Sequence, residues 1–230
     1  VWFHPNYSEY ISLLFVSSSY VLLKSKYIEN RSFYSGLLIG FATLTNLGTV
    51  FFVIGLFVIN YFNSNKKVVA SKYFIIGFSS IHILIFLVYL FIGVANEYII
   101  AMIKIPFSYI ESNFLITENL TVFLKAFQNF NNYAYALLLV SISLLIFDIF
   151  KTLKYRKYLN NKYVEIGIMI ICSLLFYIFA KKGYYHHLIF LLYFLPLTLN
   201  LANTKISKNI ISILLIMSIF TISSEFYNDS

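Results

Sequence analysis

The stretch between residues 34 and 62, YSGLLIGFATLTNLGTVFFVIGLFVINYF, decides how this chain folds. It is apolar throughout, interrupted by glycines at positions 36, 40 and 48 and by the weakly polar residues 43–46. As one helix it would be about 43 Å long, which exceeds the roughly 30 Å hydrocarbon core of a bilayer. The stretch therefore either crosses once as a tilted helix or returns as a hairpin of two short helices.

The positions of the basic residues favour the hairpin. A single crossing would split the 17 Lys and Arg residues 10 and 7 between the two faces of a membrane. A hairpin places all of them on one face except Lys104, Lys125, Lys181 and Lys182. Because cytoplasmic loops carry an excess of basic residues, the uneven distribution is the expected one. The turn would be residues 45–49, which are small and polar, as a turn within the membrane requires.

The composition places the whole chain in the membrane class. Of its 230 residues, 60% are hydrophobic and 11% are charged, which excludes an ordinary soluble domain. The net charge of +8 comes from Lys and Arg in short loops between apolar runs. This distribution orients helices in a membrane and does not indicate a nucleic-acid partner. The lone Cys172 lies in an apolar run and can build neither a disulfide nor a metal cluster.

We therefore predict an all-α fold, a polytopic transmembrane bundle of about seven to eight helices that includes the hairpin. The other expected spans are residues 10–23, 73–95, 133–150, 163–180, 188–202 and 210–223. Residues 96–132 form the one long connection, and we expect them to lie along the outer interface as amphipathic helix. We treat residues 1–230 as a single transmembrane domain. The start at Val1, without an initiator Met or a signal peptide, indicates a fragment of a longer chain.

The strongest candidate site is a run of polar residues at the mouth of the apolar segment that begins at residue 188. The run is Lys181, Lys182, Gly183, Tyr184, Tyr185, His186 and His187. Its ammonium, phenol and imidazole groups suit an anionic head group such as the phosphate of a lipid carrier. The alternative is an interfacial anchor, in which the lysines extend toward water and the tyrosines join the aromatic belt. Adjacent histidines point about 100° apart on a helix, so we expect no metal there.

Three further positions carry polar groups next to or within apolar spans. Glu9 lies where the first span leaves the outer face, and either lines a cavity or marks the interface. Asn46 lies at the predicted turn of the hairpin. His82 lies in the middle of a span, and we expect it to bond a neighbouring helix. The predicted topology gathers Glu9 and the histidine pair on the outer face, and the opposite face is only basic.

Four features, in this order, resemble the multi-spanning glycosyltransferases of the C superfamily. The nearest group is the protein O-mannosyltransferase-like and aminoarabinose-transferase-like enzymes. The features are residues 5–9 entering a span, the glycine-rich segment 35–46, residues 96–109 after a span, and residues 183–187 running into 193–197. Segment 35–46, SGLLIGFATLTN, is similar to the group's "GLLLGLAxLTK", with Asn46 where Lys is usual. Residues 183–197 are similar to its "R-x-Y-x-H-Y-x-L-x-x-x-P" region.

The resemblance implies an integral membrane enzyme of the bacterial inner membrane, with its active face outward. Such an enzyme moves a sugar from a polyprenyl-phosphate donor to a lipid, protein or glycan acceptor, surrounded by membrane lipids and without a cofactor. By resemblance, the donor phosphate is held by Lys181, Lys182, Tyr185, His186 and His187, and the cavity is lined by Glu9 and Asn46. The family's catalytic acid, the general base for the acceptor, would lie upstream of Val1, so the catalytic residue is unknown.

Two other interpretations stay open. A surface-polysaccharide polymerase or flippase shares the aromatic and basic membrane character, and it would show Arg-rich outer loops. A non-enzymatic membrane scaffold or transporter would not depend on His186 and His187. The buried charge pairs typical of ion-coupled transport are not evident in the sequence.

Overall fold

The computed structural model describes residues 7–25, 30–104, 161–179 and 189–194, and the single positions 121, 143 and 209. Every regular element in these residues is helical, which agrees with the all-α prediction. The chain divides into two compact units, Val1–Glu118 and Asn119–Ser230, and each is described by itself. The predicted spans at 133–150 and 210–223 fall outside the described residues, apart from position 143. The expectation of one transmembrane domain stays a prediction.

The first helix, α1 (Tyr7–Lys24), corresponds to the first predicted span, extended at its start by Tyr7 and Ser8. An acid in its first turn and a lysine in its last turn suit the partial charges at the two ends of a helix. Its buried apolar residues recur every three or four positions, so one face of the helix packs inward. They are Leu13, Val16, Tyr20 and Leu23.

Residues 31–63 form a helical hairpin, as the charge pattern predicted. Helix α2 (Arg31–Thr45) is followed by a short 3-10 turn, η1 (Leu47–Thr49), and by α3 (Val50–Asn63). At the open end, Ser32 Oγ donates a hydrogen bond to Asn60 Oδ1 at 2.8 Å, so α2 and α3 run in opposite directions. With 15 and 14 residues, each arm is about 22 Å long, shorter than the roughly 30 Å core of a bilayer.

The turn of the hairpin satisfies its own polar groups. Asn46 leaves the helical conformation, and its side-chain oxygen accepts from the backbone N–H of Gly48 at 3.0 Å. The hydroxyl of Thr49 donates to the carbonyl of Asn46 at 2.7 Å, and that of Thr45 donates to Ala42 at 2.8 Å. Short polar side chains that bond the nearby backbone are the usual means of closing such a turn.

The next helix, α4 (Lys67–Ile92), packs against α2 through backbone contacts at glycine. A Cβ atom on Gly36 would collide with the carbonyl oxygen of Phe74, and one on Gly77 would collide with that of Phe33. Because each helix touches the other's main chain, both positions require the smallest residue. Further along the pair, Thr43 of α2 bonds His82 of α4, so these two helices run in the same direction.

Helix α4 is also the most apolar long element of the described residues. Over its most apolar window the mean hydropathy is 2.5, and of the described helices it alone is long and apolar enough to cross a membrane. It begins at Lys67, ahead of the predicted start at residue 73. It ends at Ile92, and the next residue, Gly93, has a φ of 84°, a left-handed conformation that favours glycine and closes the helix.

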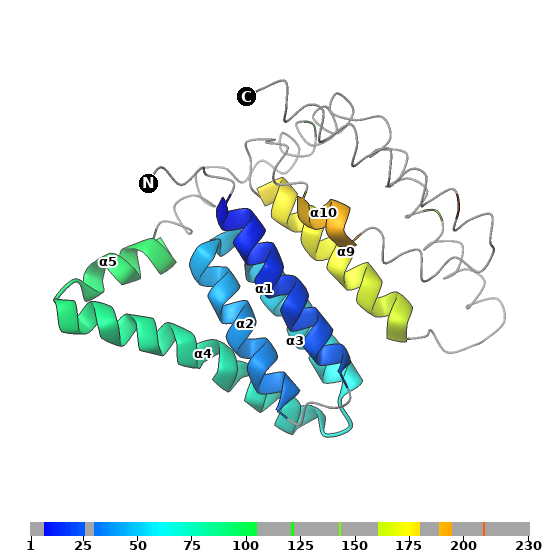
Figure 1. Ribbon diagram of the computed structural model, residues 1–230, viewed down its shortest axis with the longest axis horizontal. Helices are drawn as coiled ribbons and strands as arrows, with labels where there is room; N and C mark the ends of the chain where they lie inside the picture. Colours follow the sequence, from blue (N-terminus) through cyan, green and yellow to red (C-terminus); the bar gives the residue numbers. More distant parts are fainter. Residues whose placement is uncertain are drawn as a thin grey trace. The chain divides into compact units, whose positions relative to one another are not determined.

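The chain then turns back over the end of α4, as Figure 1 shows. Helix α5 (Ala95–Ile99) and a π-helical turn, η2 (Ile100–Lys104), begin the predicted long connection. The ring of Tyr98 lies 5.8 Å from that of Phe86 and 5.5 Å from that of Tyr89, measured between centroids. The first part of the connection is therefore helical, and the rest of it, apart from position 121, falls outside the described residues.

The second unit contains two described helices, α9 (Asn161–Phe179) and α10 (Ile189–Phe194). They correspond to the predicted span at 163–180 and to the start of the one at 188–202. The rings of Phe176 and Phe190 lie 4.5 Å apart between centroids, which joins the two helices through aromatic packing. Buried Glu165, only 3% exposed, lies on α9, and sequence analysis gave it no role.

The hairpin topology makes a prediction about accessibility from the two sides of a membrane. Because the hairpin returns to the face it entered, Ser64→Cys should react with an impermeant thiol reagent from the cytoplasmic side only. Asn96→Cys, beyond the predicted single crossing of α4, should react from the outside and serves as the matched control. Both variants are made in a Cys172→Ala background, since Cys172 is the lone cysteine. Reaction of Ser64→Cys from outside would contradict the hairpin topology.

Candidate functional site

The residues predicted to bind the donor phosphate, Lys181, Lys182, Tyr185, His186 and His187, all lie outside the described residues. The two predicted cavity-lining residues, Glu9 and Asn46, are described. Their neighbourhood and a basic cavity at the other end of the first unit are two polar regions within the described residues.

Glu9 and Asn46 lie at the same end of the first unit. Helices α1 and α2 run in opposite directions, since Ser19 and Ser35 bond through their hydroxyls at 2.6 Å and Phe15 stacks on Phe41 at 5.4 Å. Continuing this register toward the start of α1 brings Glu9 level with the hairpin turn that contains Asn46. Glu9 is buried, with 4% of its surface exposed. Their cavity-lining role stays a prediction.

A chain of three polar side chains lies near the same end. His82 Nε2 is 2.9 Å from the hydroxyl of Thr43, and His82 Nδ1 is 2.9 Å from the hydroxyl of Tyr98. The prediction that His82 bonds a neighbouring helix is therefore confirmed. Through this one imidazole, α4 is tied on one side to α2 and on the other to α5.

Both hydroxyls of the chain also have a backbone acceptor. The hydroxyl of Thr43 has the carbonyl of Gly40 at 2.8 Å, and the phenol of Tyr98 has the carbonyl of His82 at 3.4 Å. Either tautomer of the neutral imidazole can therefore complete the chain, with one ring nitrogen donating and the other accepting. Burial raises the pKa of the Tyr98 phenol above its ordinary value, and nearby Tyr89 raises it further. The phenol consequently keeps the proton that it donates.

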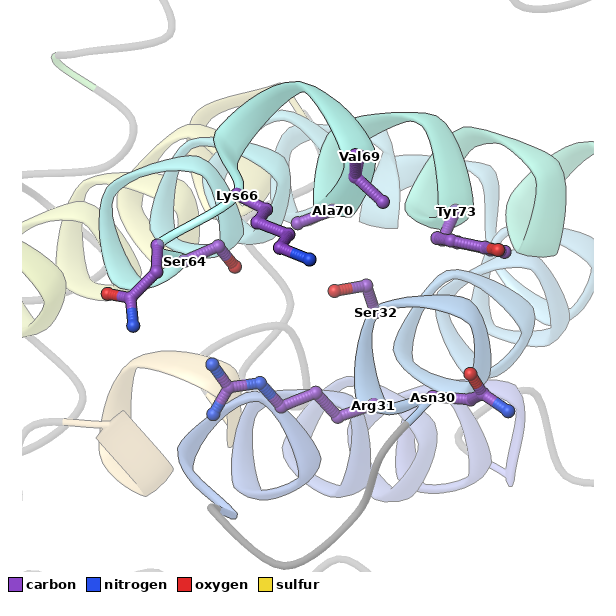
Figure 2. Close-up of a pocket in the computed structure, with 9 residues that line it drawn as sticks. Asn30, Arg31, Ser32, Ser64, Lys66, Val69, Ala70 and Tyr73 are labelled. Carbon is purple, nitrogen blue, oxygen red and sulfur yellow. The ribbon is translucent and has the colours of Figure 1, made fainter.

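The basic cavity lies at the opposite end, between the starts of α2 and α4, and has a volume of about 270 Å³. Its walls are residues 30–32 at the start of α2, residues 64–66 before α4, and Val69, Ala70 and Tyr73 of α4. Figure 2 shows the side chain of Lys66 extending into the space between the two helices, opposite the hydroxyl of Ser32.

The side chains around this cavity differ in how they are engaged. Arg31 Nη1 donates to the carbonyl of Ser25 at 2.9 Å and so ties the start of α2 to the end of α1. The ammonium of Lys67 lies 5.2 Å over the ring of Tyr61. Within residues 7–25 and 30–104, no carboxylate pairs with Lys66. Of the cations near the cavity, Lys66 is thus the one directed into it without a described counter-charge.

Sequence analysis missed this cavity, because it treated the basic face as topological charge only. The signal that would have helped is the spacing of Gly36 and Gly40, four residues apart, together with Gly77. Small residues at this spacing let two helices approach closely. Because α2 and α4 run in the same direction and pack closely, their first turns lie next to each other.

The described residues offer no metal site of the usual kind, since no three His, Cys, Asp or Glu side chains among them lie together. Comparison of the chain with protein-family models, with curated proteins and with solved structures finds no match. The function is therefore argued from the residues and from their placement.

Proposed function

We propose that this chain is the helical membrane part of a glycosyltransferase that takes its sugar from a polyprenyl-phosphate donor on the outer face. Lys181, Lys182, Tyr185, His186 and His187 bind the donor phosphate, with cations and hydrogen-bond donors that match its charge. The bundle is polytopic and lies in the bacterial inner membrane. A lipid, protein or glycan on the outer face accepts the sugar.

The observation that carries the proposal is the fold of the glycine-rich segment 35–46. This segment, on which the resemblance to the glycosyltransferases depends, forms the first arm of a hairpin with a polar turn. The turn contains Asn46 and lies at the same end of the unit as buried Glu9. These are the two residues that the resemblance assigns to the cavity, and they come from separate parts of the sequence. A short hairpin beside a wet cavity is also how membrane proteins keep polar backbone at depth.

The proposal predicts that binding of the donor phosphate depends on one pair of lysines, Lys181 and Lys182. In the full-length protein, purified in detergent, the double variant Lys181→Gln and Lys182→Gln should bind polyprenyl phosphate at least about tenfold more weakly, because charge-assisted contacts are lost. The matched control is Lys205→Gln with Lys208→Gln, which removes the same charge from a loop on the predicted opposite face. Native mass spectrometry gives the dissociation constants. Equal binding by the two double variants would overturn the proposed donor site.

A further inference from the structure

We propose that residues 95–104 form a strap that opens and closes over His82, with Gly93 as its hinge and Tyr98 as its fastening. The strap consists of α5 and η2, which turn back over the end of α4 (Figure 1). The structure shows the closed strap, in which the Tyr98 hydroxyl lies 2.9 Å from Nδ1 of His82. Opening separates these two groups and gives solvent access to the imidazole. The strap is separate from the proposed donor site and does not depend on glycosyl transfer.

The strap is only weakly stabilised by its own structure. The elements α5 and η2 have five residues each, and none of these residues is buried. Helical segments of this length are not stable in isolation, because their few hydrogen bonds do not offset the cost of helix nucleation. The second element, η2, is also a π-helical turn, a rare geometry that is frequent at functional sites. The position of the strap therefore depends on its contacts with α4.

One side chain, Tyr98, makes the specific contacts between the strap and α4 within residues 30–104. Its hydroxyl lies 2.9 Å from Nδ1 of His82 and 3.4 Å from the His82 carbonyl oxygen. Its ring packs against the rings of Phe86 and Tyr89. Every hydrogen bond and ring contact described between residues 95–104 and α4 is one of these four. Removing the Tyr98 hydroxyl should consequently weaken the attachment of the whole strap and leave the ring contacts in place.

The hinge lies between α4 and the strap, at Gly93. The closed turn is defined by two backbone hydrogen bonds: Gly93 N–H donates to the carbonyl of Leu90 at 3.1 Å, and Val94 N–H donates to that of Tyr89 at 2.9 Å. A Cβ atom added at Gly93 would meet no other part of the molecule within 4 Å, so no packed group opposes a change of the backbone angles there. Residues at the ends of elements are the usual hinges of moving segments.

The strap closes over one end of the polar chain described above. At the other end of this chain the hydroxyl of Thr43, a residue that is 3% exposed, lies 2.9 Å from Nε2 of His82. Because Thr43 is buried between the helices and Tyr98 is partly exposed, the imidazole can be reached only from its Tyr98 side. Movement of the strap thus controls solvent access to a polar group that lies between α2 and α4.

The first experiment measures hydrogen–deuterium exchange of the full-length protein in detergent, by mass spectrometry. Tyr98→Phe should speed the exchange of the amides of residues 95–104 by about twofold to tenfold, because one hydrogen bond that holds the strap closed is lost. The amides of α1, α2 and α3 should exchange as in the wild type. The matched control is Tyr89→Phe, which removes a phenol hydroxyl from the same aromatic group without touching the His82 bond, and it should leave the exchange of the strap within about twofold.

A second variant tests the hinge and leaves both bonded side chains intact. Gly93→Ala should speed the exchange of the strap by about fivefold to thirtyfold, because the left-handed conformation of the closed turn is strained for alanine. Diethyl pyrocarbonate, which modifies accessible imidazoles, should react faster with His82 in this variant by a similar factor, since both reactions require the open strap. The reaction is followed by mass spectrometry of the peptide that contains His82, and thermal unfolding checks that each variant is folded.

Faster exchange of the strap alone in both variants, together with faster modification of His82 in Gly93→Ala, supports the proposal. Equal exchange in Tyr98→Phe and Tyr89→Phe overturns it, and so does acceleration that extends equally over α2 and α4, which would show that the whole unit loosens. Unchanged modification of His82 in Gly93→Ala would show that the strap does not control access to the imidazole. Because the donor site is tested at Lys181 and Lys182, each proposal can fail without the other.

Discussion

Replacing Gly36 or Gly77 with alanine is expected to separate α4 from α2 and to unfold the first unit. A Cβ atom at either position would meet a backbone carbonyl of the other helix, and a backbone atom has no rotamer by which to move aside. Overpacking of a tight contact usually costs about 1–3 kcal/mol, and this contact belongs at or above the upper end of that range. The pair also carries the Thr43–His82 bond, which is lost when the helices separate.

The measurement is the thermal unfolding of the full-length protein in detergent, followed by intrinsic fluorescence or by light scattering. The matched control is Gly167→Ala in α9, since a Cβ there has nothing within 4 Å. Alanine in an open helical position stabilises by up to about 1 kcal/mol, so the control should melt at or above the wild-type temperature. If Gly36→Ala unfolded at the same temperature as the Gly167→Ala control, the close contact between α2 and α4 would be refuted.

Removing the amide group of Asn60 is expected to have the second largest effect on stability. Asn60 is 1% exposed, accepts from Ser32 and donates through Nδ2 to the carbonyl of Ala70 at 3.0 Å. It thus ties the end of α3 to the starts of both α2 and α4. Asn60→Leu keeps the number and branching of the side-chain heavy atoms and removes both bonds, and Ser32 is left as a buried donor without a partner. The free energy of unfolding should fall by about 1–3 kcal/mol.

A double-mutant cycle separates the hydrogen bond from the change in packing. Ser32→Ala combined with Asn60→Leu removes the orphaned hydroxyl, so the double variant should be more stable than the sum of the single effects predicts, by about 0.5–3 kcal/mol. Asn96→Leu, at an exposed position on α5, is the control for the loss of an amide and should change stability little. Strict additivity of the two single variants would show that the Ser32–Asn60 bond contributes nothing.

Much of the fold of the first unit could be predicted from the length of its apolar stretches and from the positions of its basic residues. Residues 34–62 were too long for one crossing, and the basic residues on either side pointed to a return, so the hairpin with its turn at Asn46 was predictable. His82 was likewise assigned correctly, because an imidazole on an apolar helix requires a polar neighbour. These inferences work from sequence because they depend on the period of a helix, the thickness of a bilayer and the need to satisfy polar groups.

The basic cavity could not be predicted in the same way. It depends on α2 and α4 starting side by side, and the register of two helices is set by contacts such as those of Gly36 and Gly77. Charge patterning also gave Lys66 and Arg31 a role in topology, which hid any role in binding. The start of α4 was placed late for a related reason, since Lys67 and Lys72 were counted as loop and in the structure are part of the helix.

The self-contained turn between α2 and α3 bears on how the protein is made. In the contacts described above, the polar side chains of the turn bond only to the backbone of the hairpin. These side chains are Thr45, Asn46 and Thr49. The turn therefore needs no later part of the chain to satisfy these polar groups, which would matter in the membrane that we propose for this protein. If the chain lies in a membrane, as we propose, two short helices with such a turn can enter the bilayer together as one unit during synthesis. The site for α4 on the glycines of α2 then exists before α4 itself has emerged.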